Sequence, residues 1–163
     1  MNLLKTMIFT ILVPGTVTIL IPRWVLAAEC SQPISVVRFI GLIPLAIGVA
    51  IYLWCAWDFA TAGKGTPVVF DPPKRLVVRG LYKFVRNPMY VGILSILFGE
   101  ALLLTSPYLF GYAVMVTTIF HCFVVWYEEP ALTKKFGDEY RQYRAQVPRW
   151  LPSFNNRAER SAQ

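Results

Sequence analysis

Long apolar stretches alternate with short polar ones along this chain, and the pattern predicts membrane-spanning helices. No charged residue occurs within 6–22, 39–57 or 101–127, and the last stretch follows a shorter apolar one, 87–99, after the single charge of Glu100. A helix that crosses the hydrocarbon core of a bilayer needs about 20 mostly apolar residues and satisfies its own backbone polar groups. Each long stretch can therefore supply at least one such helix.

Ser106-Pro107 is a turn signal inside the last stretch, so we predict two helices there. The four predicted membrane-spanning helices cover about 6–22, 38–57, 88–105 and 108–127. The chain has 163 residues, of which 56% are hydrophobic, and its mean hydropathy is +0.50. These values favour a single integral-membrane domain over residues 1–163.

An alternative interpretation of the first apolar stretch is a cleaved signal peptide, because "VLAAE" follows it. Only Lys5 precedes the stretch, and Pro14-Gly15 interrupts it. Glu29 also occupies the position where a lipoprotein cleavage site has a small residue. We therefore expect the first helix to be retained.

The 16 Lys and Arg residues are distributed unevenly and predict an orientation. Six lie between the second and third predicted helices, seven follow the fourth, and none lies between the third and fourth. Positive residues collect on the cytoplasmic side of a membrane. We predict that both termini and the 58–87 loop are cytoplasmic, at a bacterial inner membrane. The net charge of +7 then reflects topology and anionic lipid headgroups, and we expect no nucleic-acid partner.

Beyond the fourth predicted helix, aromatic residues keep a helical period. Phe136, Tyr140, Tyr143 and Val147 lie at i, i+4, i+7 and i+11. We predict an interfacial amphipathic helix that ends at Pro148 and either anchors the tail or also covers a functional site. The predicted fold class is therefore all-α: a polytopic membrane protein with about four transmembrane helices and a C-terminal interfacial helix.

Two polar clusters lie at mirror positions around the last two predicted helices. "RNPMYVG", residues 86–92, begins the third helix, and "YEEP", residues 127–130, ends the fourth. A short connection makes these helices an antiparallel hairpin, so both clusters lie at its cytoplasmic end. The residues expected to meet there are Arg86, Asn87 and Tyr90 on one side and Glu128 and Glu129 on the other.

The first cluster has the residues of a helix start. Asn87 is a favourable N-cap and Pro88 suits the first helical position. The free N–H groups of the first turn, with Arg86 beside them, can bind a carboxylate or phosphate. The alternative is a capped membrane helix with no ligand.

The second cluster is harder to explain by structure alone. Glu128 and Glu129 are adjacent carboxylates at a predicted helix C-terminus, where they repel each other and oppose the helix dipole. They need a cationic partner, which is either a ligand or an arginine such as Arg86.

Two further ionisable residues lie inside the predicted helices. His121 precedes Glu128 by seven residues, two helical turns, and is either functional or an interhelical hydrogen-bond partner. Glu100 lies nearer the outer face, and we expect a structural role for it.

Metal and phosphate-loop sites are not indicated. The three cysteines, Cys30, Cys55 and Cys122, lack metal-ligand spacing, so we assign no metal site. "GKGTP" in the 58–87 loop lacks the GxxxxGK[ST] pattern, and we expect a structured loop on the membrane surface.

A family resemblance rests on two segments of the chain. "GLYKFVRNPMYVG" followed by "EEPALTKKFGDEYRQYRAQVPRWLP" resembles the integral-membrane methyltransferases related to isoprenylcysteine carboxyl methyltransferase and phospholipid N-methyltransferases. The resemblance covers about residues 80–152. Several family members have His where this chain has Asn87, which leaves a polar helix cap but removes any contact specific to His.

The resemblance implies that S-adenosylmethionine (SAM) is the methyl donor and binds at the cytoplasmic end of the hairpin. It implies catalytic roles for Glu128, Glu129 and Arg86. The segment from Phe136 through Gly137 and Glu139 to Tyr143 should fold over the cofactor. The cofactor-binding residues expected on this basis are Tyr82, Arg86, Asn87, Pro88, Met89, Tyr90, His121, Glu128, Glu129, Tyr140 and Tyr143.

The chemistry of these residues agrees with that implication. The carboxylate of SAM suits Arg86 and a helix N-terminus, and its amino group or ribose suits Glu128 or Glu129. Tyrosine faces can stabilise a sulfonium. A carboxylate acceptor needs no general base, whereas an amine acceptor must lose a proton, and either glutamate is then the candidate base. We expect a lipid-like acceptor to enter sideways between helices.

Two alternatives remain at this point. One is a non-enzymatic membrane protein, such as a small transporter or complex subunit, in which the glutamates merely pair with arginines. The other is a membrane NADPH-dependent sterol-type reductase, for which four spans are few. Isoprenylcysteine, a phospholipid headgroup, a quinone-like lipid or a small thiol would each fit as methyl acceptor.

Overall fold

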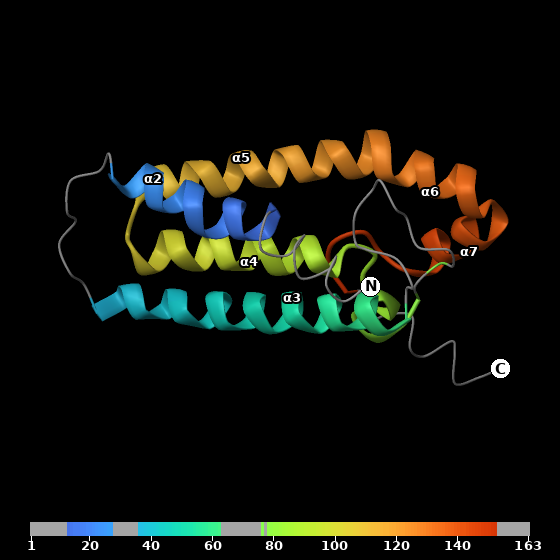
Figure 1. The fold of residues 1–163 in the computed structure, drawn as a ribbon, viewed down its shortest axis with the longest axis horizontal. Coiled ribbons are helices and arrows are strands. Elements are labelled where there is room, and N and C mark those ends of the chain that lie inside the picture. The colour runs from blue at the N-terminus through green and yellow to red at the C-terminus, as the bar shows by residue number, and fades with distance from the viewer. Residues whose placement is uncertain (1–12, 28–35, 63–75, 77, 153–163) are drawn as a thin grey trace.

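A computed structural model describes residues 13–27, 36–62, 76 and 78–152, and every regular element in these ranges is helical. Figure 1 shows the longer helices running side by side, with two shorter helices, α6 and α7, gathered at one end. This arrangement confirms the predicted all-α fold. The "GKGTP" segment and Cys30 lie outside the described residues.

The first described helix runs over Val13–Ala27 and differs from the prediction at its end. It contains a π-helical turn, η1 (Thr16–Leu20), followed by α2 (Ile21–Ala27). The helix continues five residues beyond the predicted span, which ended at residue 22. The π-turn precedes Pro22 and lets the helix continue through it, because a π-turn accommodates a residue that cannot donate the regular hydrogen bond. Residues 6–12 of the predicted helix lie outside the described residues.

The second and third helices lie close to their predicted positions. A 3-10 turn, η2 (Val36–Gly41), leads into α3 (Leu42–Ala62). A second 3-10 turn, η3 (Gly80–Lys83), precedes α4 (Pro88–Leu103). The predicted turn follows α4, where Ser106 Oγ accepts a hydrogen bond from Leu109 N at 3.1 Å.

The fourth helix is longer than predicted. It passes from α5 (Pro107–Phe123) through a π-helical turn, η4 (Val124–Glu128), into α6 (Glu129–Phe136) without a break. The helix therefore continues nine residues beyond the predicted span, and the expectation that the two glutamates lie at a helix C-terminus is wrong. Within η4 the Glu129 N–H bonds to Val124 O, an i to i−5 pattern. This wider turn accommodates Pro130, which has no N–H.

Glycines set the distance between α3 and α4. A Cβ built at Gly48 would lie 2.6 Å from Gly92 O, and one built at Gly99 would lie 2.6 Å from Leu45 N. Both contacts are with backbone atoms of the facing helix, so the two backbones touch directly. This close approach gives α4 a fixed position against α3.

Two clusters of buried apolar residues pack the other elements against one another. The larger one joins Tyr52 of α3, Leu97 of α4 and Ala113 of α5, and the Tyr112 hydroxyl donates to Val17 O at 3.0 Å. The smaller one contains Tyr140, Tyr143 and Val147 and packs against Leu76, Leu132 and Phe136. The apolar face predicted for the C-terminal helix therefore packs on the protein itself.

The C-terminal helix starts later than its periodicity suggested. Gly137 has a φ of 55° and separates α6 from α7 (Asp138–Gln146), so Phe136 belongs to the preceding helix. Glycine accepts this left-handed conformation at little cost. Val147 is extended, and the predicted end at Pro148 is correct to within two residues.

Length and composition qualify two helices as membrane spans, Arg38–Asp58 and Pro107–Phe136. Val13–Ala27 and Pro88–Leu103 are shorter apolar helices. The four predicted spans thus correspond to four apolar helices, two of which are long enough to cross a bilayer.

Candidate active site

The two polar clusters of the hairpin meet in a buried ion pair. Arg86 Nη1 lies 2.8 Å from Glu129 Oε1, and their side chains are only 9% and 6% exposed. Arg86 comes from the turn before α4 and Glu129 from the start of α6. The antiparallel hairpin therefore brings these sequence-distant groups together, as its topology predicted.

Arg149 makes a bidentate contact with the same carboxylate. Its Nε donates to Glu129 Oε1 at 2.7 Å and its Nη2 donates to Oε2 at 3.0 Å. Arg144 Nη1 lies farther away, 3.9 Å from Oε2. Bidentate arginine–carboxylate contacts are strong and fix the orientation of both groups. Glu129 thus has arginine partners, which is one of the two outcomes considered from the sequence.

Both glutamates follow the predicted span 108–127 and lie in the last third of a helix that is longer than a bilayer core requires. The helix Pro107–Phe136 has 30 residues, about 45 Å at 1.5 Å per residue, whereas the hydrocarbon core is about 30 Å thick. Burial alone would raise the pKa of Glu129, but the hydrogen bond from Arg149 and the charges of Arg86, Arg149 and Arg144 outweigh it. The pKa of Glu129 is therefore below its ordinary value, and the group is ionised at neutral pH.

Glu128 has a different environment although it is the adjacent residue. The Tyr90 hydroxyl donates to Glu128 Oε2 at 2.9 Å, and no ion pair joins Glu128 to any described residue. Burial raises the pKa of Glu128 and the neighbouring Glu129 raises it further, while the hydrogen bond from Tyr90 lowers it. The net pKa of Glu128 is above its ordinary value, which suits a group that exchanges a proton.

The segment after α7 is attached to the start of α4 by backbone contacts. Arg86 N donates to Pro148 O at 2.9 Å, and Asn87 Nδ2 donates to Arg149 O at 3.2 Å. Asn87 occupies the N-cap position as predicted, but its side chain makes no capping hydrogen bond. The expected capping hydrogen bond to Asn87 Oδ1 is therefore absent, and the side chain instead donates through Nδ2 to the tail.

The tyrosines predicted from α7 cover this cluster. Tyr140 is 3% exposed and its side chain hydrogen-bonds Arg86. The Tyr143 hydroxyl donates to Tyr82 O at 2.7 Å. Burial raises the pKa of Tyr140, so its hydroxyl stays protonated. Of the remaining candidates, Pro88 is fully buried and Met89 packs against the larger apolar cluster.

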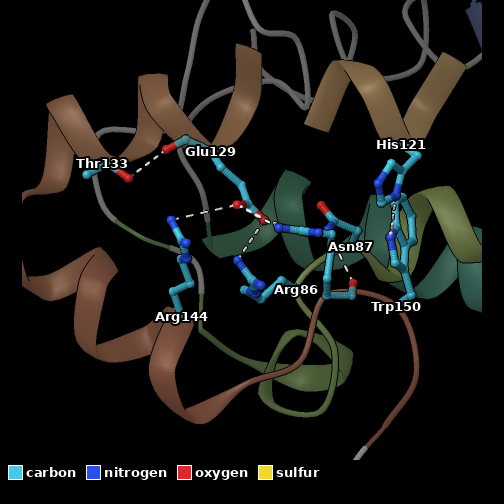
Figure 2. Close-up of polar contacts among 8 residues, drawn as sticks. Arg86, Asn87, His121, Glu129, Thr133, Arg144 and Trp150 are labelled. Carbon is cyan, nitrogen blue, oxygen red and sulfur yellow. Dashed lines mark hydrogen bonds and ion pairs between the residues drawn. The ribbon is translucent and has the colours of Figure 1, made fainter. Parts of the chain in front are cut away.

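His121 lies to one side of the arginine–glutamate cluster, next to Trp150 (Figure 2). Trp150 Nε1 donates to His121 Nδ1 at 3.2 Å, and the ring centroids are 6.1 Å apart. The accepting Nδ1 leaves the proton of a neutral imidazole on Nε2. Glu128 lies within the π-turn η4, so the two regular helical turns predicted between His121 and Glu128 are not formed.

His121 and Trp150 line an open, mostly apolar groove of about 610 Å³. Its walls come from α3, α4, α5 and the segment after α7. The lining residues are Pro44, Val91, Leu94, Ser95, Phe98, Thr117, Thr118, His121, Trp150 and Leu151. The groove thus ends beside the residues that hold the tail on the hairpin.

Sequence reasoning missed Arg149 and Trp150, which contribute to the cluster and to the groove. Both lie between Pro148 and Pro152, in a segment that cannot continue a helix. An arginine beside a tryptophan in such a non-helical segment indicates that the tail packs against another part of the protein. The sequence did not identify Glu129 as the partner of Arg149, because Glu129 lies 20 residues away on another helix.

These elements and side chains define a helical protein with apolar helices and a buried arginine–glutamate cluster at one end. A family model described as Phospholipid methyltransferase matches residues 36–139, which include both polar clusters of the hairpin. The chain belongs to the phospholipid methyltransferase family. This membership agrees with the resemblance seen in the sequence and favours neither the non-enzymatic nor the reductase alternative.

Several characterised relatives are methyltransferases that differ in acceptor. The chain is 41% identical to methanethiol S-methyltransferase 1 of Bradyrhizobium diazoefficiens over 80 residues, 49% of this chain and 27% of that protein. It is 30% identical to a probable protein-S-isoprenylcysteine O-methyltransferase of Oryza sativa subsp. japonica over 128 residues, 71% of this chain and 61% of that protein.

A third relative, phosphatidylethanolamine N-methyltransferase of Pyrenophora tritici-repentis, is 34% identical over 111 residues, 63% of this chain and 11% of that protein. The chain spans less than two thirds of the length of each of these three relatives. Their names specify S-, O- and N-methylation, so family membership leaves the acceptor atom open.

Proposed function

We propose that this protein is a SAM-dependent methyltransferase that acts on a lipid-like acceptor at the cytoplasmic face of a membrane. The observation that carries the proposal is the buried Arg86–Glu129–Arg149 cluster, with the Tyr90–Glu128 pair beside it. This cluster joins the two segments that resemble the methyltransferases, and the family match covers Arg86, Tyr90, Glu128 and Glu129.

The polar groups of the cluster fit a zwitterionic cofactor. Arg86 Nε is buried, and no described residue hydrogen-bonds it. An unused guanidinium donor suits the carboxylate of an amino acid. Glu128, whose only described hydrogen bond is with Tyr90, has acceptor capacity for an amino group or ribose hydroxyls. When bound, SAM would supply an electrophilic methyl group for in-line transfer to the acceptor.

Each glutamate has its own role in this proposal. Glu129 holds Arg86 and Arg149 in place, because its two oxygens already accept hydrogen bonds from both arginines. Glu128 faces the cofactor, and it accepts the proton that an amine acceptor must release. The raised pKa of Glu128 strengthens it as a base. An oxygen or sulfur acceptor that reacts as an anion would not need this step.

Aromatic residues around the cluster exclude water from the transfer. Tyr82, Tyr140 and Tyr143 are buried, and Tyr140 contacts Arg86. A site for methyl transfer needs alignment and dryness more than a protein nucleophile. The C-terminal segment therefore acts as a cover over the cofactor, in addition to any contact with the membrane surface.

The apolar groove supports a lipid-like acceptor. It follows α4 from Val91 to Phe98 and ends at His121 and Trp150. Seven residues of α-helix correspond to about 10 Å, enough for part of an acyl or prenyl chain. A methyl acceptor with an apolar chain would lie along the groove with its polar group at the Trp150 end, next to the arginine–glutamate cluster.

The aromatic residues at the helix ends support four spans in one domain, 1–163, and the distribution of Lys and Arg supports cytoplasmic termini. At the end near the cluster, Trp57 and Trp126 are 66% and 76% exposed, and at the opposite end Trp24 is 82% exposed. Tryptophans favour the two interfaces of a membrane. The cofactor-binding part covers about residues 80–152, and the expected location is a bacterial inner membrane.

The first test is SAM binding by calorimetry on the detergent-purified protein. Glu128→Gln is the informative variant, because the loss of Glu129 would also disturb two arginines. We expect binding by the wild type and at least about tenfold weaker binding by Glu128→Gln. Asp138→Asn is the matched control, since the Asp138 side chain is 83% exposed, and it should bind like the wild type.

The acceptor is then identified by transfer of labelled methyl from SAM to a prenylated cysteine, phosphatidylethanolamine or a short alkyl thiol. Labelling of one of the first two supports the lipid-like acceptor, and labelling of the thiol alone refutes it. If the folded wild type does not bind SAM, the methyltransferase proposal fails.

A further inference from the structure

Asp58 is a buried carboxylate near the end of α3 that faces the η3 turn. The residue is 4% exposed, although aspartate is seldom buried without partners. Its Oδ1 lies 3.4 Å from Arg79 Nε, and the Arg79 side chain is 55% exposed. This ion pair offsets only part of the cost of burial. Oδ2 is buried, and no described residue hydrogen-bonds it.

The unpartnered oxygen of Asp58 packs directly on Gly80. A Cβ built at position 80 would overlap Asp58 Oδ2 and would lie 3.1 Å from Trp54 Nε1. Gly80 also has a φ of 55°, a conformation that favours glycine. One carboxylate thus contacts two successive residues, Arg79 through one oxygen and Gly80 through the other. A buried polar atom without a hydrogen bond is rare in native proteins and calls for a structural or functional explanation.

The contact on Gly80 determines how the chain enters the site. Gly80 begins the η3 turn, which carries Tyr82 inward to a side-chain hydrogen bond with Cys55, one turn before Asp58 on α3. Tyr82 O accepts the hydrogen bond from Tyr143, so α7 is attached to the same turn. Arg86 follows four residues later.

We propose that Asp58 is a positioning residue for the site: it holds the η3 turn on α3 and thereby places Arg86 and Asn87 opposite Glu129. The inference rests on the proposed function, because it assigns Asp58 to the cofactor site. The two oxygens of the buried carboxylate contact different residues of the turn: Oδ1 pairs with Arg79, and Oδ2 packs against Gly80. Asp58 itself does not touch the cofactor.

The test compares Asp58→Ala and Asp58→Asn with the wild type in detergent. Asp138→Asn is the matched control, because Asp138 also pairs with an arginine, Arg141 at 2.9 Å, but is 83% exposed. Two quantities are measured: hydrogen exchange of the 78–90 peptide and the dissociation constant for SAM. Exchange reports the position of the turn without requiring activity.

We expect Asp58→Ala to increase exchange in 78–90 but not in α5, and to weaken SAM binding by about tenfold or more, since small displacements of binding groups are costly. Asp58→Asn keeps an oxygen for Arg79, so its exchange in 78–90 and its dissociation constant for SAM should lie between those of Asp58→Ala and the wild type. Asp58→Asn also serves as the test of the inference if Asp58→Ala does not fold. The control should match the wild type in both measurements.

The inference is overturned if exchange in 78–90 is unchanged, or if it rises equally in α4 and α5, which would indicate a general loss of stability. Failure of the wild type to bind SAM would refute the proposed function and Asp58's role in it. Exchange would then still decide whether Asp58 holds the turn.

Discussion

Two adjacent glutamates with the same side chain have opposite electrostatic surroundings in this protein. Glu129 is held by Arg86 and Arg149 at 2.8 and 2.7 Å, whereas Glu128 shares a hydrogen bond with Tyr90. Arginine charges keep the first carboxylate ionised, and burial favours the protonated form of the second. At the scale of residues, this difference is the reason for proposing a structural role for Glu129 and a reactive one for Glu128.

Glu129→Gln should strongly destabilise the protein. The substitution leaves Arg86, with a side chain 9% exposed, without its counter-charge. Removing one partner of a buried ion pair costs about 3–5 kcal/mol because the other charge stays buried. Thermal unfolding in detergent should show a clear decrease in melting temperature. Glu128→Gln should have a much smaller effect, since its amide oxygen still accepts from Tyr90. Equal melting temperatures for both variants would contradict this assignment.

At the scale of elements, local backbone features decide how the helices meet. Gly48 and Gly99 let α3 and α4 touch along their backbones. The π-turn η4 carries the fourth helix past Pro130, so that Glu129 faces Arg86 at the start of α6 rather than ending a helix. The close helix contact depends on the missing side chain of glycine. The π-turn depends on the missing N–H of proline.

Gly48→Ala should lower stability and Gly111→Ala should not. A methyl group at Gly48 would lie 2.6 Å from Gly92 O and 2.8 Å from Ile96 N, which are backbone atoms that cannot rotate away. Overpacking of this kind costs about 1–3 kcal/mol. Gly111 has no atom within 4 Å of its added Cβ, and alanine also favours the helix. Melting temperatures compare the two variants, and similar values would argue against direct backbone contact.

At the scale of the whole molecule, the cluster lies at one end of the helices, together with α6, α7 and the segment that follows them (Figure 1). Basic residues of the described chain gather there, including Arg79, Lys83, Lys134 and Lys135. The opposite end of the α4–α5 hairpin is the uncharged turn at Ser106. This charge asymmetry would place the cluster on the cytoplasmic side.

Reporter fusions test this orientation. Green fluorescent protein fused after residue 163 should fluoresce, and alkaline phosphatase fused at the same point should be inactive, because the C-terminus is predicted to be cytoplasmic. A truncated chain fused to phosphatase after residue 105 should be active. Active phosphatase at the C-terminus would reverse the proposed orientation and move the site to the other side of the membrane.

The sequence by itself determined the helical class and the meeting of the two polar clusters. Apolar stretches without charge identify helices regardless of their partners, and Ser106-Pro107 marks the hairpin turn. An antiparallel hairpin then brings Arg86 and Glu129 together by geometry alone. The family resemblance was also readable, because its two segments flank that hairpin.

Only the tertiary structure decided where the helices end and which groups pair. The fourth helix continues to Phe136 because η4 accommodates Pro130, a hydrogen-bond pattern with no distinct residue signature. Arg149 reaches Glu129, and Asp58 packs on Gly80, through contacts between segments far apart in the chain. Such pairings depend on how close two backbones come and on which donors remain free, and periodicity along one segment contains neither quantity.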